Sequence, residues 1–308
     1  MDEFDIIRRY FANAQMPEYV STGPGDDCAV LSIPPGHELC VSTDTLLADV
    51  HFPGDATPEV IAHRAFAANL SDLAAMGAAP HSVTLALTFP EANEAWLEAF
   101  GNAIAEWSKQ IPLVGGNLAK GALSVTLTVM GVVPVGAAIL RSGAKAGDDV
   151  YVSGTLGGAA GAVKQLGQPN ANSAMLKKYQ KPQPQLDLGL ALRGVASAAI
   201  DISDGLIADL GHLIAASEVG ATLTLDQVPM LPELSQVFGN EQALSLALGG
   251  GDDYELCFTA AVSQRDKIQE IARELDVSLS RLGNIVSDQS GIRDSHGAEL
   301  HAIGYRHF

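Results

Sequence analysis

The chain has 308 residues, of which 47% are hydrophobic and 18% are charged, and its formal net charge is −18. This length and composition predict a folded protein with room for two ordinary domains, and they exclude a disordered chain. The negative charge and the absence of any basic run in the sequence exclude nucleic acid as the expected partner. Three isolated cysteines and an acidic N-terminus without a signal-peptide pattern indicate a cytoplasmic protein with free thiols.

The first half of the sequence predicts a domain over residues 1–137 with a mixed or antiparallel sheet. A Pro-Pro-Gly turn separates two strands, at residues 28–33 and 38–47, and we expect them to pair as a hairpin that brings Asp27 near Asp44. Apolar periodicity predicts the other elements: helices over 3–13, 58–76 and 93–110, and strands over 82–88, 112–114 and 123–133. This alternation of strands and helices indicates the α/β class.

Residues 122–140 carry no charge and are long enough to suggest a membrane-spanning helix. Residues 124–129, however, alternate at the period of a β-strand, and Gly131, Pro134 and Gly136 interrupt the rest. We therefore expect a buried strand and a turn, and no membrane partner.

The second half predicts an α/β domain over residues 138–308. A strand over 199–205 breaks into a helix that begins near Leu206, and residues 168–183 are predicted to be irregular. Strands are also expected at 149–153, 221–225, 256–259 and 282–286, and helices within 154–167 and at 186–197.

Acidic and hydroxyl side chains gather in five short packets: Gly25–Asp27, Ser42–Asp44, Ser71–Asp72, Asp201–Gly205 and Gly249–Glu255. Carboxylate and hydroxyl oxygens are ligands that suit Mg²⁺. We predict that the packets meet around several metal ions that hold a nucleoside triphosphate. Structural explanations stay open for single packets, because Asp26 and Asp27 could be turn residues and Ser203 or Asp204 could cap a helix.

Asp72 is a candidate metal ligand. On the helix predicted over 58–76, Asn69 and Asp72 share a face with small apolar residues. A carboxylate on a buried face needs a partner or a metal ion, although a hydrogen-bonded Asp near the helix end is the alternative. Gly115 and Gly116 are less decisive, because they could bring backbone close to a ligand or form a hairpin turn.

No glycine-rich loop with the lysine of a nucleotide-binding motif is present, and neither is the serine elbow of a hydrolase. A carboxylate-rich metal cage remains. Phosphoryl transfer suits such a cage, because metal ions position and neutralise phosphate oxygens and little covalent chemistry is asked of the protein.

In chain order, the segments Gly25–Ala29, Ser42–Leu46, Asn69–Gly77, Asp201–Leu206 and Gly250–Leu256 resemble motifs of the bacterial thiamine-monophosphate kinases. The wider superfamily includes aminoimidazole ribonucleotide synthetase, selenophosphate synthetase and the hydrogenase-maturation dehydratase. The resemblance implies an N-terminal sheet domain that pairs with its copy in a homodimer, and a C-terminal α/β domain. It also implies a kinase that transfers phosphate from ATP directly to thiamine monophosphate, which gives thiamine diphosphate.

The resemblance further implies functional residues, position by position. No residue is assigned as a covalent or general-base catalyst. Mg²⁺ binding is implied for Asp27, Ser42, Thr43, Asp44, Asp72, Asn117, Asp201 and Asp204, and ATP binding for Gly116, Asn117, Arg141 and Ser203. His51, Glu255 and Tyr305 match substrate-contacting positions, with Tyr305 against the thiamine rings.

One departure concerns residues 115–120, where the family pattern is Gly-Gly-Asp-Thr-Thr-Arg. Asn117 replaces the charged metal ligand of that pattern with a neutral amide, and Lys120 lacks the planar fork of Arg. Two alternatives therefore stay open: a catalytically impaired nucleotide-binding homologue, and a related ATP-dependent enzyme with another small substrate. Selenophosphate synthetase and the dehydratase are disfavoured, because Cys28 and Cys40 lie in predicted strands and the chain ends in Phe308.

Overall fold

The computed structural model describes residues 3–11, 16–288 and 291–301. The chain forms two compact units. The N-terminal unit comprises Met1–Leu73 and Ala78–Gly136, and the C-terminal unit comprises Ala74–Gly77 and Ala137–Phe308. Each unit combines strands with helices, which confirms the predicted α/β class.

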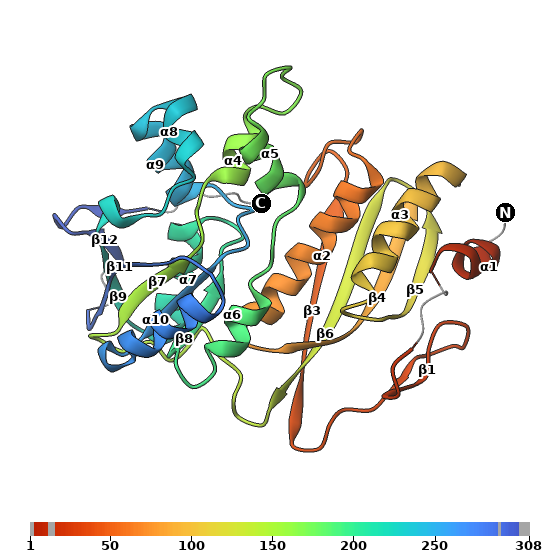
Figure 1. Ribbon diagram of the computed structural model, residues 1–308, viewed down its shortest axis with the longest axis horizontal. Coiled ribbons are helices and arrows are strands. Elements are labelled where there is room, and N and C mark those ends of the chain that lie inside the picture. The colour runs from red at the N-terminus through yellow and green to blue at the C-terminus, as the bar shows by residue number, and fades with distance from the viewer. Residues whose placement is uncertain (1–2, 12–15, 289–290, 302–308) are drawn as a thin grey trace. The chain divides into compact units, whose positions relative to one another are not determined.

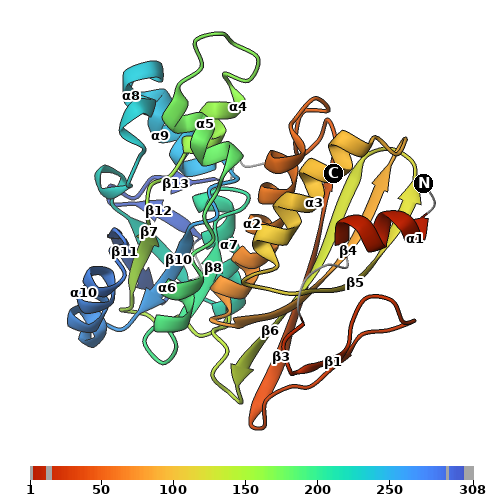
Figure 2. The same ribbon diagram turned by 45° about the vertical axis from the view of Figure 1, so that its right-hand side comes forward.

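The N-terminal unit is built on a four-stranded sheet in the order β3-β6-β4-β5. Its strands are β3 (His37–Leu47), β4 (Ala79–Phe89), β5 (Leu113–Lys120) and β6 (Ser124–Pro134). The pair β4 and β5 is parallel and the other two pairs are antiparallel, so the sheet is mixed, as predicted. Helices α2 (Pro58–Ala75) and α3 (Glu94–Trp107) lie on one face (Figure 1, Figure 2), and the chain begins with α1 (Glu3–Ile6) and the π-helical η1 (Ile7–Phe11).

The alternation along β6 explains why the uncharged run of residues 122–140 is a strand. Val125, Leu127 and Val129 are fully buried, whereas Thr126 and Thr128 between them are only partly buried. Two faces of different polarity are typical of a strand in a sheet that is covered on one side. Among the described residues, none of the helices has the length and apolar character needed to cross a membrane.

The predicted hairpin between residues 28–33 and the following strand is wrong. The short strand β2 (Val30–Leu31) pairs with β1 (Val20–Thr22) instead, and β3 pairs with β6 over its whole length. Strand β6 offers β3 an unbroken antiparallel ladder from His37 to Leu47. Pro34 and Pro35, in contrast, remove two N–H donors from the segment that was expected to lead into the hairpin.

The C-terminal unit is built on a seven-stranded sheet in the order β13-β12-β9-β11-β7-β10-β8. Its strands are β7 (Asp149–Ser153), β8 (Ala198–Asp201), β9 (Gly220–Leu223), β10 (Leu256–Ala260), β11 (Leu279–Val286), β12 (Ile292–Asp294) and β13 (Glu299–Leu300). Its helices are α4 (Gly158–Val163), α5 (Ser173–Gln180), α6 (Leu186–Ala191), α7 (Leu206–Ser217), α8 (Pro232–Phe238), α9 (Asn240–Gly249) and α10 (Arg265–Glu274), with 3₁₀ turns η2 (Leu225–Gln227) and η3 (Val262–Gln264).

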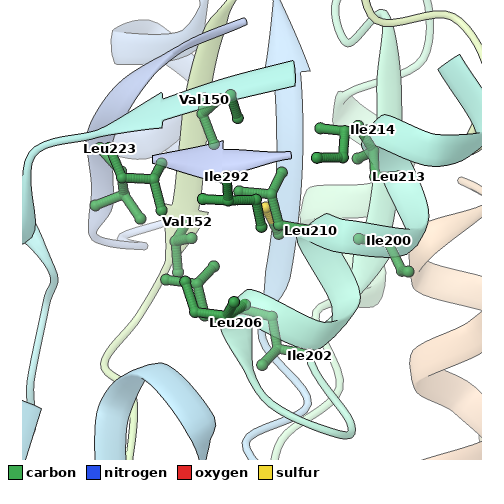
Figure 3. Packing of buried hydrophobic residues seen from close by; sticks show 14 of the residues in the cluster. Val150, Val152, Ile200, Ile202, Leu206, Leu210, Leu213, Ile214, Leu223 and Ile292 are labelled. Atoms are coloured by element: carbon green, nitrogen blue, oxygen red, sulfur yellow. The ribbon is translucent and has the colours of Figure 1, made fainter. Parts of the chain in front are cut away.

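Helix α7 is anchored in the core of this unit. Leu206, Leu210 and Leu213 follow one another at helical spacing and lie in one buried cluster with Val150 and Val152 of β7 (Figure 3). Burying a leucine side chain contributes about 1.5–3 kcal/mol to the stability of the fold. The buried leucines therefore hold α7, including its first turn at Leu206, against the sheet.

The prediction that residues 168–183 are irregular is wrong, because α5 lies within them. The side chain of Asn172 caps this helix by accepting hydrogen bonds from the backbone N–H groups of Ala174 (3.0 Å) and Met175 (3.2 Å). Met175 and Tyr179 of this helix, one turn apart, are buried. The Asn cap followed by this apolar pair is the pattern that indicates the helix.

Candidate metal and nucleotide site

Two of the predicted metal ligands meet in the N-terminal unit. The hydroxyl Oγ of Ser42 on β3 donates a hydrogen bond of 2.5 Å to Oδ2 of Asp72 on α2. Both side chains are partly buried. A bond of this length between a hydroxyl and a carboxylate is charge-assisted, and it sets three hard oxygen atoms side by side.

Asn69, one turn before Asp72, fixes the neighbouring part of β3. Its Nδ2 donates to the carbonyl of Ala65 (2.9 Å), and its Oδ1 accepts the backbone N–H of Asp44 (3.0 Å). The side chain is fully buried, so both bonds are made away from water. The sequence marks Asn69 as polar on an apolar face, and the structure gives the reason: it links helix α2 to the backbone of Asp44.

Thr43 faces the other side of the sheet. Its Oγ1 lies 2.9 Å from Oγ1 of Thr128 on β6, and Thr45 makes the same kind of contact with Thr126 at 2.8 Å. Successive side chains of a strand point to opposite faces, so the side chain of Thr43 does not accompany Ser42 and Asp44. The implied role of Thr43 in metal binding stays a prediction.

Asp27 lies in the exposed loop between β1 and β2. Its N–H donates to Oδ1 of Asp26 (2.8 Å), which is the local bond expected of turn residues. Tyr19, at the base of this loop, donates its hydroxyl proton to the carbonyl of His81 (2.7 Å) and holds the segment against β4. Because the predicted hairpin with β3 does not form, the geometric argument that placed Asp27 beside Asp44 is lost.

His51 lies in the loop after β3 and is held at two points. Its Nδ1 accepts the backbone N–H of Leu47 (3.0 Å), and its carbonyl accepts a hydrogen bond from Nη2 of Arg64 (2.9 Å). Arg64 is almost completely buried, with 1% of its surface exposed. Since Nδ1 accepts, the neutral imidazole carries its proton on Nε2.

Gly116 and Asn117 lie within strand β5, so the hairpin reading of the paired glycines is wrong. A Cβ atom on Gly116 would lie 2.0 Å from the carbonyl oxygen of Leu85 on β4, which means that only glycine allows the two strands to approach here. Asn117 is exposed at this edge of the sheet. Whether it meets a ligand stays a prediction.

In the C-terminal unit, Ser203 and Asp204 form the loop between β8 and α7, and Asp201 ends the strand. The sequence suggests that Ser203 or Asp204 caps α7. The structure shows that Gly205 holds the cap position, without a side-chain bond, and that Oδ2 of Asp209 takes over this role. It accepts the N–H groups of Ser203, Asp204 and Gly205, each at 3.0 Å. Burial raises the pKa of Asp209 to about 7, and these N–H bonds act against that rise.

The glycine-rich segment 249–255 packs on this loop. The carbonyl of Ser203 accepts the N–H of Asp252 (2.9 Å), and the carbonyl of Ile202 accepts that of Tyr254 (2.9 Å). A Cβ atom on Gly251 would lie 2.2 Å from the carbonyl oxygen of Ser203, so a side chain at this position is excluded. Two of the predicted acidic packets therefore meet through their backbones.

Glu255 is buried, with 3% of its surface exposed, and both of its oxygens are engaged. Oε2 accepts the hydroxyl proton of Ser153 (2.7 Å), and Oε1 pairs with Nζ of Lys178 on α5 (3.2 Å). Lys178 was not among the predicted site residues, because the helix that carries it, α5, was not predicted.

Asp253, near Glu255, is also buried. Its Oδ2 accepts the N–H of Gly157 (2.8 Å), and its Oδ1 has no hydrogen-bond partner within the described part of the chain. Burial, together with the negative charges of Glu255 and Asp252, raises the pKa of Asp253 to about 8. Lys178 supplies a positive charge next to these two buried carboxyl groups.

Arg141 is exposed and lies between the two sheets in sequence, and Tyr305 lies outside the described residues. Within the described ranges, no three His, Cys, Asp or Glu side chains stand close enough to form a metal site by themselves. Mg²⁺ commonly takes one or two carboxylates and completes its shell with substrate phosphates and water. The Ser42–Asp72 pair fits that kind of site.

Comparison with known proteins identifies the family. Residues 25–133 match the model of the N-terminal domain of AIR synthase related proteins, and residues 145–295 match that of the C-terminal domain. The chain is 44% identical to thiamine-monophosphate kinase from Escherichia coli (strain K12), over 99% of this chain and 98% of the relative. The chain belongs to the thiamine-monophosphate kinase family.

Solved structures share the fold of this thiamine-monophosphate kinase family member. The crystal structure of thiamine-monophosphate kinase from Stenotrophomonas maltophilia K279a matches with a TM-score of 0.86 and 43% identity, over 92% of this chain and 93% of that one. AaThiL complexed with AMPPCP and TMP matches with a TM-score of 0.80 and 27% identity, over 90% and 89% of the two chains.

Proposed function

We propose that the protein transfers the terminal phosphate of ATP to the phosphate of thiamine monophosphate, with Mg²⁺ as its cofactor. The observation that carries the proposal is the short bond between Ser42 Oγ and Asp72 Oδ2, in a chain with full-length similarity to a thiamine-monophosphate kinase. A relative with the same fold has been solved in complex with AMPPCP, an ATP analogue, and TMP. These observations support an ATP-dependent kinase that acts on a phosphate.

The proposed metal ligands are Asp27, Ser42, Thr43, Asp44, Asp72, Asn117, Asp201 and Asp204. Asp72 is held by Ser42, and the backbone of Asp44 is held by Asn69, so this part of the set is rigid before any ligand arrives. When bound, Mg²⁺ supplies positive charge that neutralises the phosphate oxygens. A chain with a net charge of −18 needs such neutralisation to bind two phosphorylated substrates.

The proposed nucleotide contacts are Gly116, Asn117, Arg141 and Ser203. Arg141 supplies a planar guanidinium that can bind phosphate oxygens through two N–H groups. His51, Glu255 and Tyr305 are the proposed contacts of the acceptor. The neutral ring of His51 carries its proton on Nε2, because Nδ1 accepts the N–H of Leu47.

We also propose that the protein is a homodimer in the cytoplasm. The sheet face that carries the threonine pairs of β3 and β6 is only partly buried, and Val41 on β3 is 58% exposed. A second copy that covers this face would bury such apolar surface. Sedimentation equilibrium would show a dimer mass, and a monomer at micromolar concentration would contradict the proposal.

A comparison of acceptors tests the function. The protein is incubated with ATP, Mg²⁺ and thiamine monophosphate or free thiamine, and ADP and thiamine diphosphate are quantified by chromatography. The proposal predicts equimolar ADP and thiamine diphosphate with thiamine monophosphate and no product with free thiamine. ADP release without thiamine diphosphate would indicate another small substrate, and nucleotide binding without ADP release would indicate an impaired homologue.

A further inference from the structure

We propose that Asp209 is a positioning residue for binding of the metal–nucleotide complex. It holds the backbone of residues 203–205 through hydrogen bonds, so that Ser203 and Asp204 meet a ligand with their side chains and not with their backbone N–H groups. This inference rests on the proposed function, because it assumes that Ser203 and Asp204 meet the nucleotide and its metal ion.

Asp209 accepts the three backbone N–H groups of residues 203–205. Oδ2 accepts from Ser203, Asp204 and Gly205, each at 3.0 Å, and the side chain is 3% exposed. Three N–H groups that converge at a helix N-terminus commonly bind a phosphate or another anion. Here the side-chain carboxylate of Asp209 occupies that position, so these N–H groups are not available to the phosphates of ATP.

The opposite side of the loop is held as firmly. The carbonyl of Ser203 accepts the N–H of Asp252 at 2.9 Å. Gly205 has a φ of +118°, and a Cβ atom there would lie 2.8 Å from the carbonyl carbon of Gly249. The N–H groups of the loop thus point to Asp209 and the carbonyl of Ser203 to the glycine-rich segment, which leaves the partly buried side chains of Ser203 and Asp204 for a ligand.

The helix that carries Asp209 is packed firmly in the core. Leu206 and Leu210, on either side of it in sequence, lie in the buried cluster of the C-terminal sheet (Figure 3). The carboxylate is therefore placed by the core, and it transmits that placement to the loop through three hydrogen bonds. Residues that orient a metal ligand in this way typically change metal affinity or activity about 10- to 100-fold when they are replaced.

Asp209→Asn tests the inference, because it keeps the shape of the side chain but removes its charge. We expect an about 10- to 100-fold loss of kcat/KM for ATP, together with a higher Mg²⁺ concentration at half-saturation. The matched control is Asp187→Asn, which removes an exposed carboxylate from the first turn of α6. Wild-type Mg²⁺ dependence in folded Asp209→Asn protein would overturn the inference.

Hydrogen exchange gives a readout that does not depend on activity. In Asp209→Asn, exchange at the amides of residues 203–205 should accelerate, while exchange in β8 and in the rest of α7 stays as in the wild type. Unchanged protection at 203–205 would overturn the inference even if the wild type has no kinase activity. If the wild type has no kinase activity but exchange at residues 203–205 is faster in Asp209→Asn, the positioning role is supported and only the proposed function is contradicted.

Asp209→Glu covers the case in which the Asn variant does not fold. It keeps the charge but moves the carboxylate by one methylene group, so part of the Mg²⁺ affinity should be retained. A folded Glu variant with wild-type exchange at 203–205 and wild-type Mg²⁺ dependence would overturn the inference, and an intermediate shift in both would support it.

Discussion

Ser42 Oγ donates a 2.5 Å hydrogen bond to Asp72 Oδ2, and this bond joins the edge strand β3 to helix α2. The two residues are 30 positions apart in the chain. A carboxylate that is held in this way presents its oxygens in a fixed direction, which is the property that a metal ligand needs.

Replacing Asp72 tests this property directly. Asp72→Asn should lower kcat/KM for ATP by about 100-fold or more, because a charged metal ligand is lost while the amide oxygen still accepts the Ser42 proton. The thermal unfolding midpoint should stay within a few degrees of the wild type. Asp55→Asn, at an exposed loop position, is the control. Wild-type turnover in Asp72→Asn would remove Asp72 from the metal site.

Asn117→Asp should strengthen Mg²⁺ binding, because it adds a full negative charge at an exposed position of β5. The Mg²⁺ concentration at half-maximal activity is expected to fall about 3- to 10-fold, which corresponds to roughly 1 kcal/mol of added attraction. The same charge at Asn102, an exposed position of α3, should leave the Mg²⁺ dependence unchanged. Equal Mg²⁺ curves for the wild type and Asn117→Asp would show that position 117 does not contact an ion.

Lys178→Met should destabilise the protein, because it leaves the buried carboxylate of Glu255 without its cation. We expect a loss of about 1–2 kcal/mol in the free energy of unfolding, since Lys178 is itself partly exposed. Lys177→Met, its exposed neighbour on α5, should have little effect. Adding Glu255→Gln to Lys178→Met should restore part of the stability, and additive losses in urea titrations would contradict the pairing.

The stability of the C-terminal unit should fall in acid because of Asp149. Hydrogen bonds and charge from Arg265, and charge from Arg281, hold the pKa of this carboxyl below its ordinary value. A lowered pKa in the folded state means that the stabilisation is complete above about pH 4, the pKa of Asp in an unfolded chain, and is lost as the pH falls further.

Asp149→Asn checks the sign of this effect. The variant should be less stable than the wild type by about 1–2 kcal/mol between pH 5 and 8, because both arginines remain partly exposed. The difference should shrink below about pH 4. A difference that grows as the pH is lowered would contradict the assignment.

The sequence predicted what depends on short-range periodicity. Alternation predicts a strand over 123–133 and helical spacing predicts the helix that carries Asn69 and Asp72, and the structure confirms both elements as β6 and α2. The structure gives Asp72 a hydrogen-bond partner in Ser42, and its role as a metal ligand stays a prediction. These features follow from the chemistry of residues within one or two turns of each other.

What the sequence could not predict depends on long-range pairing. The choice of β6 rather than β2 as the neighbour of β3 is made by two strands about 90 residues apart, so Asp27 was expected in a place that the fold does not support. Strand alternation separates Thr43 from Ser42 and Asp44, but only the fold shows that Ser42 faces helix α2 and Thr43 faces away from it. Asp209 was not among the predicted site residues, although its distance of five positions from Asp204 is the signal that could have identified a capping group.

The measurement that tests the proposed phosphoryl transfer most directly is product formation from ATP and thiamine monophosphate over a range of Mg²⁺ concentrations, with a chelator as the zero point. The prediction is thiamine diphosphate in a one-to-one ratio with ADP, saturating with Mg²⁺ and abolished by the chelator. ATP that binds in the presence of Mg²⁺ but yields no thiamine diphosphate at any Mg²⁺ concentration would contradict it.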